Sequence, residues 1–123
     1  MAASASAVEG PVLDLSRDAK VCAAVLDLAL VAYLAGANSL GEYRHWLSED
    51  SEKRRDVASR LAAARRVIAV FRAENRLALA EPWLREVGAA GDIPARVIRD
   101  KGDDEAIGVM VAEAASQWLK QRR

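Results

Sequence analysis

The chain has 123 residues, a common size for one domain with a single hydrophobic core. Lys and Arg together number 18, as do Asp and Glu, so the net charge is zero. This balance excludes a bulk cationic field that would attract nucleic acid or an anionic membrane surface. Alanine, leucine, arginine and glutamate dominate, and no alternating run is bounded by hairpin turns. This composition predicts an all-α fold.

The N-terminal segment, residues 1–13, has neither the cationic start nor the continuous apolar core of a secretory signal, and we expect it to be a disordered tail. No later stretch stays apolar long enough to span a bilayer, so no membrane partner is expected. The single cysteine, Cys22, has no partner for an internal disulfide and lies among apolar residues in a helical pattern. A reducing, cytoplasmic setting fits this pattern.

Residues 14–80 are predicted to form a helical domain that contains a degenerate helix-turn-helix and a long helix. The first helix begins near Asp14 or Ser16, either of which can accept a hydrogen bond from the amides of the first turn. Gly36-Ala37-Asn38 ends this helix, and Ser39 can cap a short helix over about residues 40–47. The expected buried stripe of the first helix consists of Val21, Val25, Leu28, Val31, Ala32 and Ala35.

The long helix begins after the capping and acidic residues at 48–51. Its apolar positions recur at alternating steps of four and three, a pattern suited to packing against another helix, either inside this chain or in a second copy. Asn75 is the polar member of this seam and either fixes a register or marks where the seam meets solvent. The seam consists of Val57, Leu61, Ala64, Ile68, Phe71, Asn75 and Ala78.

Residues 81–123 form a C-terminal region that is rich in turn residues. Pro82 ends the long helix or begins a short one, Gly88 and Gly91 mark turns, and Pro94 begins a brief helix to about residue 100. An acidic run at 103–105 then starts the final helix, which closes on basic residues. The apolar face expected for that helix consists of Ile107, Met110, Val111, Ala114, Ala115 and Trp118.

The sequence offers little for catalysis: one histidine, one cysteine, no Gly-rich phosphate loop, no metal-ligand spacing and no plausible triad. We therefore expect no catalytic, cofactor-binding or metal site, and no enzyme activity. His45 beside Trp46 is typical of ordinary helix-surface chemistry, and the acids at 103–105 are explained by the preference for acids at a helix start.

Residues 30–47 resemble a helix-turn-helix, with Ala32 as the small residue of the first helix and Gly36 at the turn. Tyr43 and Trp46 would anchor the second helix, whereas Glu42 places a negative charge on a helix that would approach phosphates. The polar candidates for contact with operator DNA are Asn38, Ser39, Arg44, His45, Arg54 and Arg55.

Charges on the long helix leave the DNA hypothesis open. Acidic residues surround the cationic run at 53–55, so that run is either a phosphate-binding patch or a solvated face. Further arginines could serve nucleic acid, an acidic partner surface or solubility. They are Arg60, Arg65, Arg66, Arg72 and Arg76.

A helix-turn-helix and a long helix, followed by Trp83, a proline-led run at 94–100, a glycine and a closing amphipathic helix, resemble the Xre/MbcA/ParS antitoxin family. The resemblance covers roughly residues 26–119, and the last third carries most of it. The asparagine usually found between the tryptophan and the proline is replaced by the run at 87–91, and Lys101 separates the Arg-Asp pair from its glycine. Residues in matching kinds of position are Trp83, Pro94, Ile98, Arg99, Asp100 and Gly102.

The resemblance implies an antitoxin that binds a RES-domain toxin, an enzyme acting on NAD, and covers its active site. It also implies an N-terminal domain that dimerises or represses the shared operon, and hence a homodimer or a larger hetero-oligomer with the toxin. The two alternatives are a stand-alone helix-turn-helix regulator and a purely structural helical adaptor. The toxin-binding residues expected are Trp83, Pro94, Arg96, Arg99, Asp100, Gly102, Trp118, Lys120, Arg122 and Arg123.

For the chain end we weigh two interpretations: either Trp118, Lys120, Arg122 and Arg123 reach toward the toxin pocket, or Trp118 belongs to the core and the basic residues form a frayed end.

Overall fold

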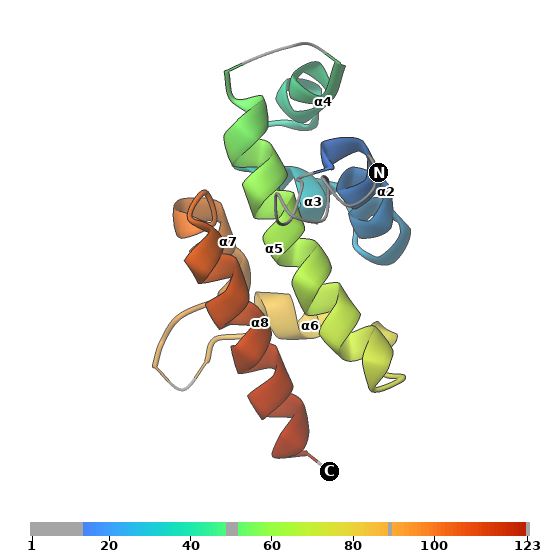
Figure 1. Ribbon diagram of the computed structural model, residues 1–123, viewed down its shortest axis with the longest axis vertical. Coiled ribbons are helices and arrows are strands. Elements are labelled where there is room, and N and C mark those ends of the chain that lie inside the picture. Colours follow the sequence, from blue (N-terminus) through green and yellow to red (C-terminus); the bar gives the residue numbers. More distant parts are fainter. Residues whose placement is uncertain (1–13, 49–51, 89, 123) are drawn as a thin grey trace, which may run out of the picture.

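The computed structural model describes residues 14–48, 52–88 and 90–122, and within these ranges the chain forms helices and no strand. The expected all-α fold is confirmed (Figure 1). The expected tail at 1–13 lies outside the described residues. The helices are α2 (Leu15–Val25), α3 (Leu28–Ala35), α4 (Leu40–Ser48), α5 (Arg54–Ala73), α6 (Ala80–Arg85), α7 (Pro94–Lys101) and α8 (Glu105–Lys120), with a 3₁₀ turn, η1 (Leu77–Leu79), before α6.

The long helix α5 is the centre of the fold, with α2 and α3 on one side and α8 on the other (Figure 1). Small residues let α8 approach α5 closely, because a Cβ added to Gly108 would lie 3.0 Å from the Cβ of Ala63. Farther along the same two helices, the rings of Phe71 and Trp118 are 6.0 Å apart. The two helices therefore run in the same direction, and one continuous core joins the N-terminal and C-terminal regions.

The expectation of one first helix from 14 to 35 is wrong, because the chain breaks between α2 and α3. Leu26 is extended, and the Asp27 side chain accepts a hydrogen bond from the amide of Ala29 at 3.2 Å, which begins a new helix. The amide of Asp27 in turn donates to Glu81 Oε1 at 2.7 Å. The apolar stripe continues across the break, and so periodicity alone did not reveal it.

The caps expected around the first two predicted helices are present. The Asp14 side chain accepts from the amide of Arg17 at 3.0 Å, and Gly36 ends α3 with φ 93° in the left-handed region. Ser39 Oγ accepts from the amide of Glu42 at 3.0 Å, while Glu42 Oε1 accepts from the amide of Asn38 at 2.8 Å. The Ser39 bond is that of a capping box, and Glu42 reaches back to the amide one residue before the cap, which explains the acid at position 42.

The seam of α5 packs inside this chain, and of the two alternatives the internal core is confirmed. Its first five members, from Val57 to Phe71, are buried, whereas Asn75 and Ala78 are exposed. Asn75 has φ 58°, a left-handed conformation that asparagine tolerates, and α5 ends at Ala73 rather than near residue 80. Asn75 therefore lies where the seam meets solvent.

The expected apolar face of α8 is partly wrong. Val111 and Ala115 are buried, but Met110 is 53% exposed and Ala114 is exposed as well. Gly108 and Leu119 complete the buried face instead. Apolar residues thus occur on two sides of α8, and the outward side is available for another purpose.

Candidate functional site

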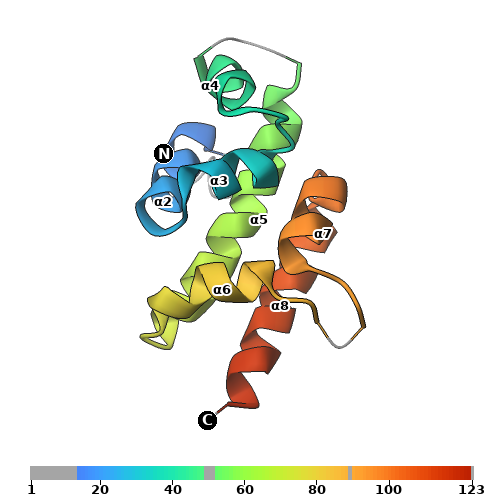
Figure 2. The same ribbon diagram turned by 180° about the vertical axis from the view of Figure 1, so that it is seen from behind.

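An open groove of about 580 Å³ lies in the C-terminal region. One wall is the outward side of α8, and the other is the loop between α6 and α7, which projects beside α8 in both views (Figures 1 and 2). Four of the residues expected to bind toxin line this groove, namely Trp83, Pro94, Trp118 and Arg122. The fold therefore gathers side chains that lie up to a third of the chain apart.

Both tryptophans of the groove are anchored on the core. The Phe71 ring lies 5.9 Å from the Trp83 ring and 6.0 Å from the Trp118 ring, with interplanar angles of 50° and 56°. Tilted contacts of this kind are favourable and hold the rings in place. Trp118 is half-buried and also lines the groove, so its core role and its surface role are combined.

The loop wall is held by its own backbone. The amide of Gly88 donates to the carbonyl of Asp92 at 2.7 Å, and the amide of Gly91 donates to the carbonyl of Gly88 at 2.9 Å. Gly91 has φ 87°, which only glycine adopts without strain. The Val87 side chain on this loop is 61% exposed. Val87, Gly88 and Ala90, from the segment that departs from the antitoxin family pattern, thus line one wall of the groove.

Charged groups without intramolecular ion pairs border the groove. The Arg122 guanidinium lies 3.8 Å from the Trp118 ring centroid and donates to the Trp118 carbonyl at 3.5 Å. No ion pair joins Arg122 to another described residue, and in the same ranges no side-chain hydrogen bond or ion pair engages Glu86 or Asp92 on the opposite wall. The groove is therefore apolar at its base, with a cation on one wall and two carboxylates on the other.

Arg99 is engaged inside the fold. Its guanidinium donates to the carbonyls of Tyr33 at 2.8 Å and Ala37 at 2.9 Å and to Asn38 Oδ1 at 3.2 Å, and it lies 4.6 Å from the centroid of the Tyr33 ring. These contacts attach α7 to the end of α3, where the Ala37 carbonyl gains a donor and the Tyr33 carbonyl, which already accepts from the amide of Gly36, gains a second one. They also engage the Asn38 side chain, which was expected to contact DNA.

Gly102 is buried where the turn after α7 approaches α5. Its carbonyl accepts from Ser59 Oγ at 2.7 Å, and a Cβ built on it would collide with the carbonyl oxygen of Ile98. This position is occupied by glycine for packing, and it presents no surface to a partner. Arg96 and Asp100 remain exposed on α7 as an ion pair at 3.7 Å, Lys120 is exposed, and Arg123 lies outside the described residues.

The residues expected to bind DNA divide into two groups. Arg54 Nη1 donates to the carbonyls of Trp46 at 3.1 Å and Leu47 at 2.8 Å and so closes the end of α4, while Ser39 begins the same helix. Arg44, His45 and Arg55 are exposed. The structure therefore keeps part of the expected set at the surface and uses the rest to build the helical pair.

The arginines of α5 are also largely committed to the fold. Arg65 Nε lies 3.0 Å from Asp18, Arg66 Nη2 lies 3.3 Å from Glu105, and Arg60 Nη2 lies 4.0 Å from Asp103. These pairs attach α2 and the start of α8 to the central helix. Sequence reasoning missed them because the partners are distant in the chain.

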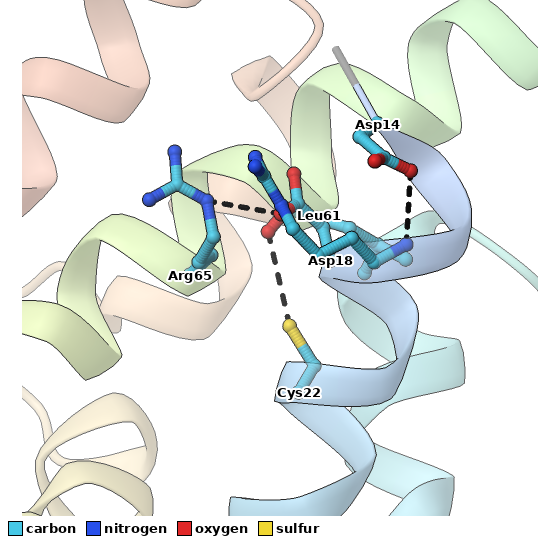
Figure 3. A network of polar contacts seen from close by, with 6 residues as sticks. Asp14, Asp18, Cys22, Leu61 and Arg65 are labelled. Atoms are coloured by element: carbon cyan, nitrogen blue, oxygen red, sulfur yellow. Dashed lines mark hydrogen bonds and ion pairs between the residues drawn. The ribbon is translucent and has the colours of Figure 1, made fainter.

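Asp18 is the most deeply buried acid in the described chain, at 1% exposure, and Arg65 contacts it (Figure 3). The neighbouring Arg17 also lies within ion-pair distance of Asp18, at 3.4 Å. One turn later the Cys22 thiol donates to the carbonyl of Leu61 at 3.8 Å. Burial, aided by the negative Asp18, raises the pKa of Cys22 to about 12. Cys22 therefore stays a protonated thiol near neutral pH and acts as a core residue.

Within the described ranges no three side chains of His, Cys, Asp or Glu are grouped so as to hold a metal ion, and no helix there is long and apolar enough to cross a membrane. No family model matches the sequence, and comparison with curated proteins and with solved structures finds no match either.

Proposed function

We propose that this chain is the antitoxin of a type II toxin–antitoxin pair, acting in the cytoplasm on a RES-domain toxin that consumes NAD. The proposal starts from the resemblance carried by Trp83 and the proline-led run at 94–100. Its toxin contact is the groove between α8 and the loop residues 86–88 and 90–93, in a hetero-oligomer whose toxin active site is covered by the bound antitoxin.

The observation that carries this proposal is the chemistry of the groove. Two exposed apolar side chains, Val87 and Met110, stand at the mouth of a recess whose base is formed by core-anchored tryptophans. Protein interfaces are enriched in aromatic residues, Met and Arg, and the strongest contributions come from anchors near the centre of the contact. An antitoxin needs such complementarity and no chemistry of its own.

Neutralisation by co-expression tests the proposal. Deleting residues 102–123 would remove α8 and with it Val111, Ala115 and Leu119 from the core, so a point substitution is the better probe. Ala114→Arg places a long cation in the groove, and Ala69→Arg makes the same change at an exposed position of α5 outside it. Wild type and Ala69→Arg should restore growth against the toxin of the adjacent gene, and Ala114→Arg should not. Full rescue by a folded Ala114→Arg would reject the groove as the toxin contact.

Operon repression through the α3–α4 pair and the adjoining start of α5 is the second part of the proposal. It is favoured by Arg44 and Arg55, which are exposed and form no ion pair with another described residue. A stand-alone regulator would need the same side chains but no toxin. Rescue of growth separates the two functions.

A further inference from the structure

The groove is long in one direction. Along α8 it extends from Met110 to Gln121, the residue that caps the helix, and eleven steps of helical rise correspond to about 17 Å. That distance equals about three turns of a second helix lying beside α8. A chain segment of that length would place apolar anchors at positions i, i+3 or i+4, and i+7 against the groove.

The walls accommodate a helix rather than an extended strand. Small residues, Gly88 and Ala90 on the loop and Ala114 on α8, are among those that line the groove and leave room for a helical backbone to approach. The backbone of α8 is bonded within its helix, the loop amides of Gly88 and Gly91 are bonded within the loop, and the described residues contain no sheet edge. Along the α8 wall an incoming segment therefore meets backbone groups that are already bonded and must satisfy its own, which a helix does internally.

The charges at the rim specify the flanks of that helix. Arg122 is on the α8 wall, and Glu86 and Asp92 are on the loop wall, with no side-chain ion pair to any other described residue. A helix lying between the walls is complementary when it carries a carboxylate on the flank facing Arg122 and a basic residue on the flank facing the two acids. Such complementarity selects the orientation as well as the partner.

We propose that the groove between α8 and the loop residues 86–88 and 90–93 receives an amphipathic helix of about three turns from another protein. This helix has apolar anchors on one face, an acidic flank toward Arg122 and a basic flank toward Glu86 and Asp92. The inference takes the partner's identity from the proposed antitoxin function, but its shape and charge come from the groove itself.

Selection from random displayed peptides of about 16 residues on the immobilised full chain tests this inference, with Ala114→Arg used to discard peptides that bind elsewhere. The enriched peptides should show apolar residues at helical spacing between an acidic and a basic flank. Enrichment of sequences with strand-like alternation would overturn the proposal. So would a selection in which no enriched peptide binds the wild type better than Ala114→Arg.

A titration of the best enriched peptide then measures the contacts. Affinity should fall roughly ten-fold or more for Ala114→Arg and stay within about two-fold for Ala69→Arg. Arg122→Glu should weaken the wild-type peptide and favour a version whose acidic flank is changed to lysine. A peptide with a central proline should lose binding, because proline breaks the helix. Equal binding of the proline peptide would overturn the helical occupant.

Sedimentation of the full chain tests the other possible occupant of the groove, a second copy of this chain. The wild type and Ala114→Arg should sediment alike, because a groove that receives a different protein does not make the chain self-associate. Self-association that Ala114→Arg abolishes would assign the groove to a second copy and overturn the proposal. Peptide binding without any rescue of growth against the toxin would support the helix-binding groove and reject the antitoxin function. Rescue of growth without peptide binding would support the antitoxin function and reject the helix-binding groove.

Discussion

Replacing Arg99 by alanine tests how α7, whose first residue Pro94 lines the groove, is attached to the rest of the molecule. The substitution removes three donated hydrogen bonds, to the carbonyls of Tyr33 and Ala37 and to Asn38 Oδ1, together with the stacking on Tyr33. Nothing else on α7 provides a polar attachment to the end of α3 among the described residues. The helix should therefore loosen at its outer side.

The magnitude follows from the exposure of the site. A hydrogen bond to a charged group contributes about 1.5–3 kcal/mol when buried, but Arg99 is only half-buried, so water replaces part of each. We assign about 0.7 kcal/mol to each bond and about 0.5 kcal/mol to the ring contact, or about 2–3 kcal/mol together. With an unfolding entropy of about 2.1 cal/mol/K per residue, this loss lowers Tm by roughly 8–12 °C.

Thermal unfolding followed by circular dichroism measures this loss, with Arg96→Ala as a matched control on the same helix. Arg96 is exposed and pairs only with Asp100 at 3.7 Å, an i,i+4 contact that contributes a few tenths of a kcal/mol, so its Tm should fall by about 1–2 °C. Arg99→Lys should recover less than half of the loss, because one ammonium cannot reach three acceptors. If Arg99→Ala melted within about 2 °C of Arg96→Ala, the attachment described here would be refuted.

Three further predictions concern the other polar groups. Asp18→Ala should lower the free energy of unfolding in urea by about 2–3 kcal/mol, less than for a fully buried pair because the Arg65 side chain is 32% exposed; a loss below about 0.5 kcal/mol would contradict this. The fold raises the pKa of Cys22 from 9.0 to about 12, so between these two pH values the unfolded chain loses the thiol proton while the folded chain keeps it, and the free energy of unfolding should fall as pH rises. Cys22→Ala should reduce the slope of that free energy against pH by about 1.4 kcal/mol per pH unit. An unchanged slope would argue against the buried thiol. In promoter binding, Arg44→Ala and Arg55→Ala should each lower the slope of log affinity against log salt by about 0.9, whereas Arg54→Ala should chiefly lower Tm; no gel shift at low salt, with or without toxin, would remove the repressor function.

Most helix positions could be predicted from the sequence, because periodicity and caps are local signals. Asp14, Ser39 and Pro94 each stand at a helix start, and Gly36 ends α3 as expected. The break at Asp27 was missed because the apolar pattern runs through it. The usable signal was the residue type itself, since aspartate is a favoured N-cap and Asp27 caps the amide of Ala29.

The candidate site could be predicted only in part. Trp83 and Pro94 were expected from the resemblance to the antitoxin family, and Trp118 and Arg122 from a chain end that could reach toward a toxin pocket. The structure brings all four into one groove. The outward role of Met110 could not be predicted, because a helix with apolar residues on two sides gives no local sign of which side faces the core.

The arginines show why surface function is hard to predict from composition. Arg54, Arg65 and Arg99 look alike in the sequence, yet each is bound to a group that lies 7 to 66 residues away or on another helix. Whether a cation is available to a partner depends on such tertiary contacts. Neither net charge nor charge runs report them.

The most direct test of the central claim is the affinity of the purified chain for the RES-domain toxin of the adjacent gene, measured by titration calorimetry. Ala114→Arg should weaken the complex roughly 30-fold or more, the loss expected when an anchor pocket is blocked, while Ala69→Arg should bind as the wild type does. Equal affinity of the wild type and a fully folded Ala114→Arg would contradict the assignment of the groove to the toxin.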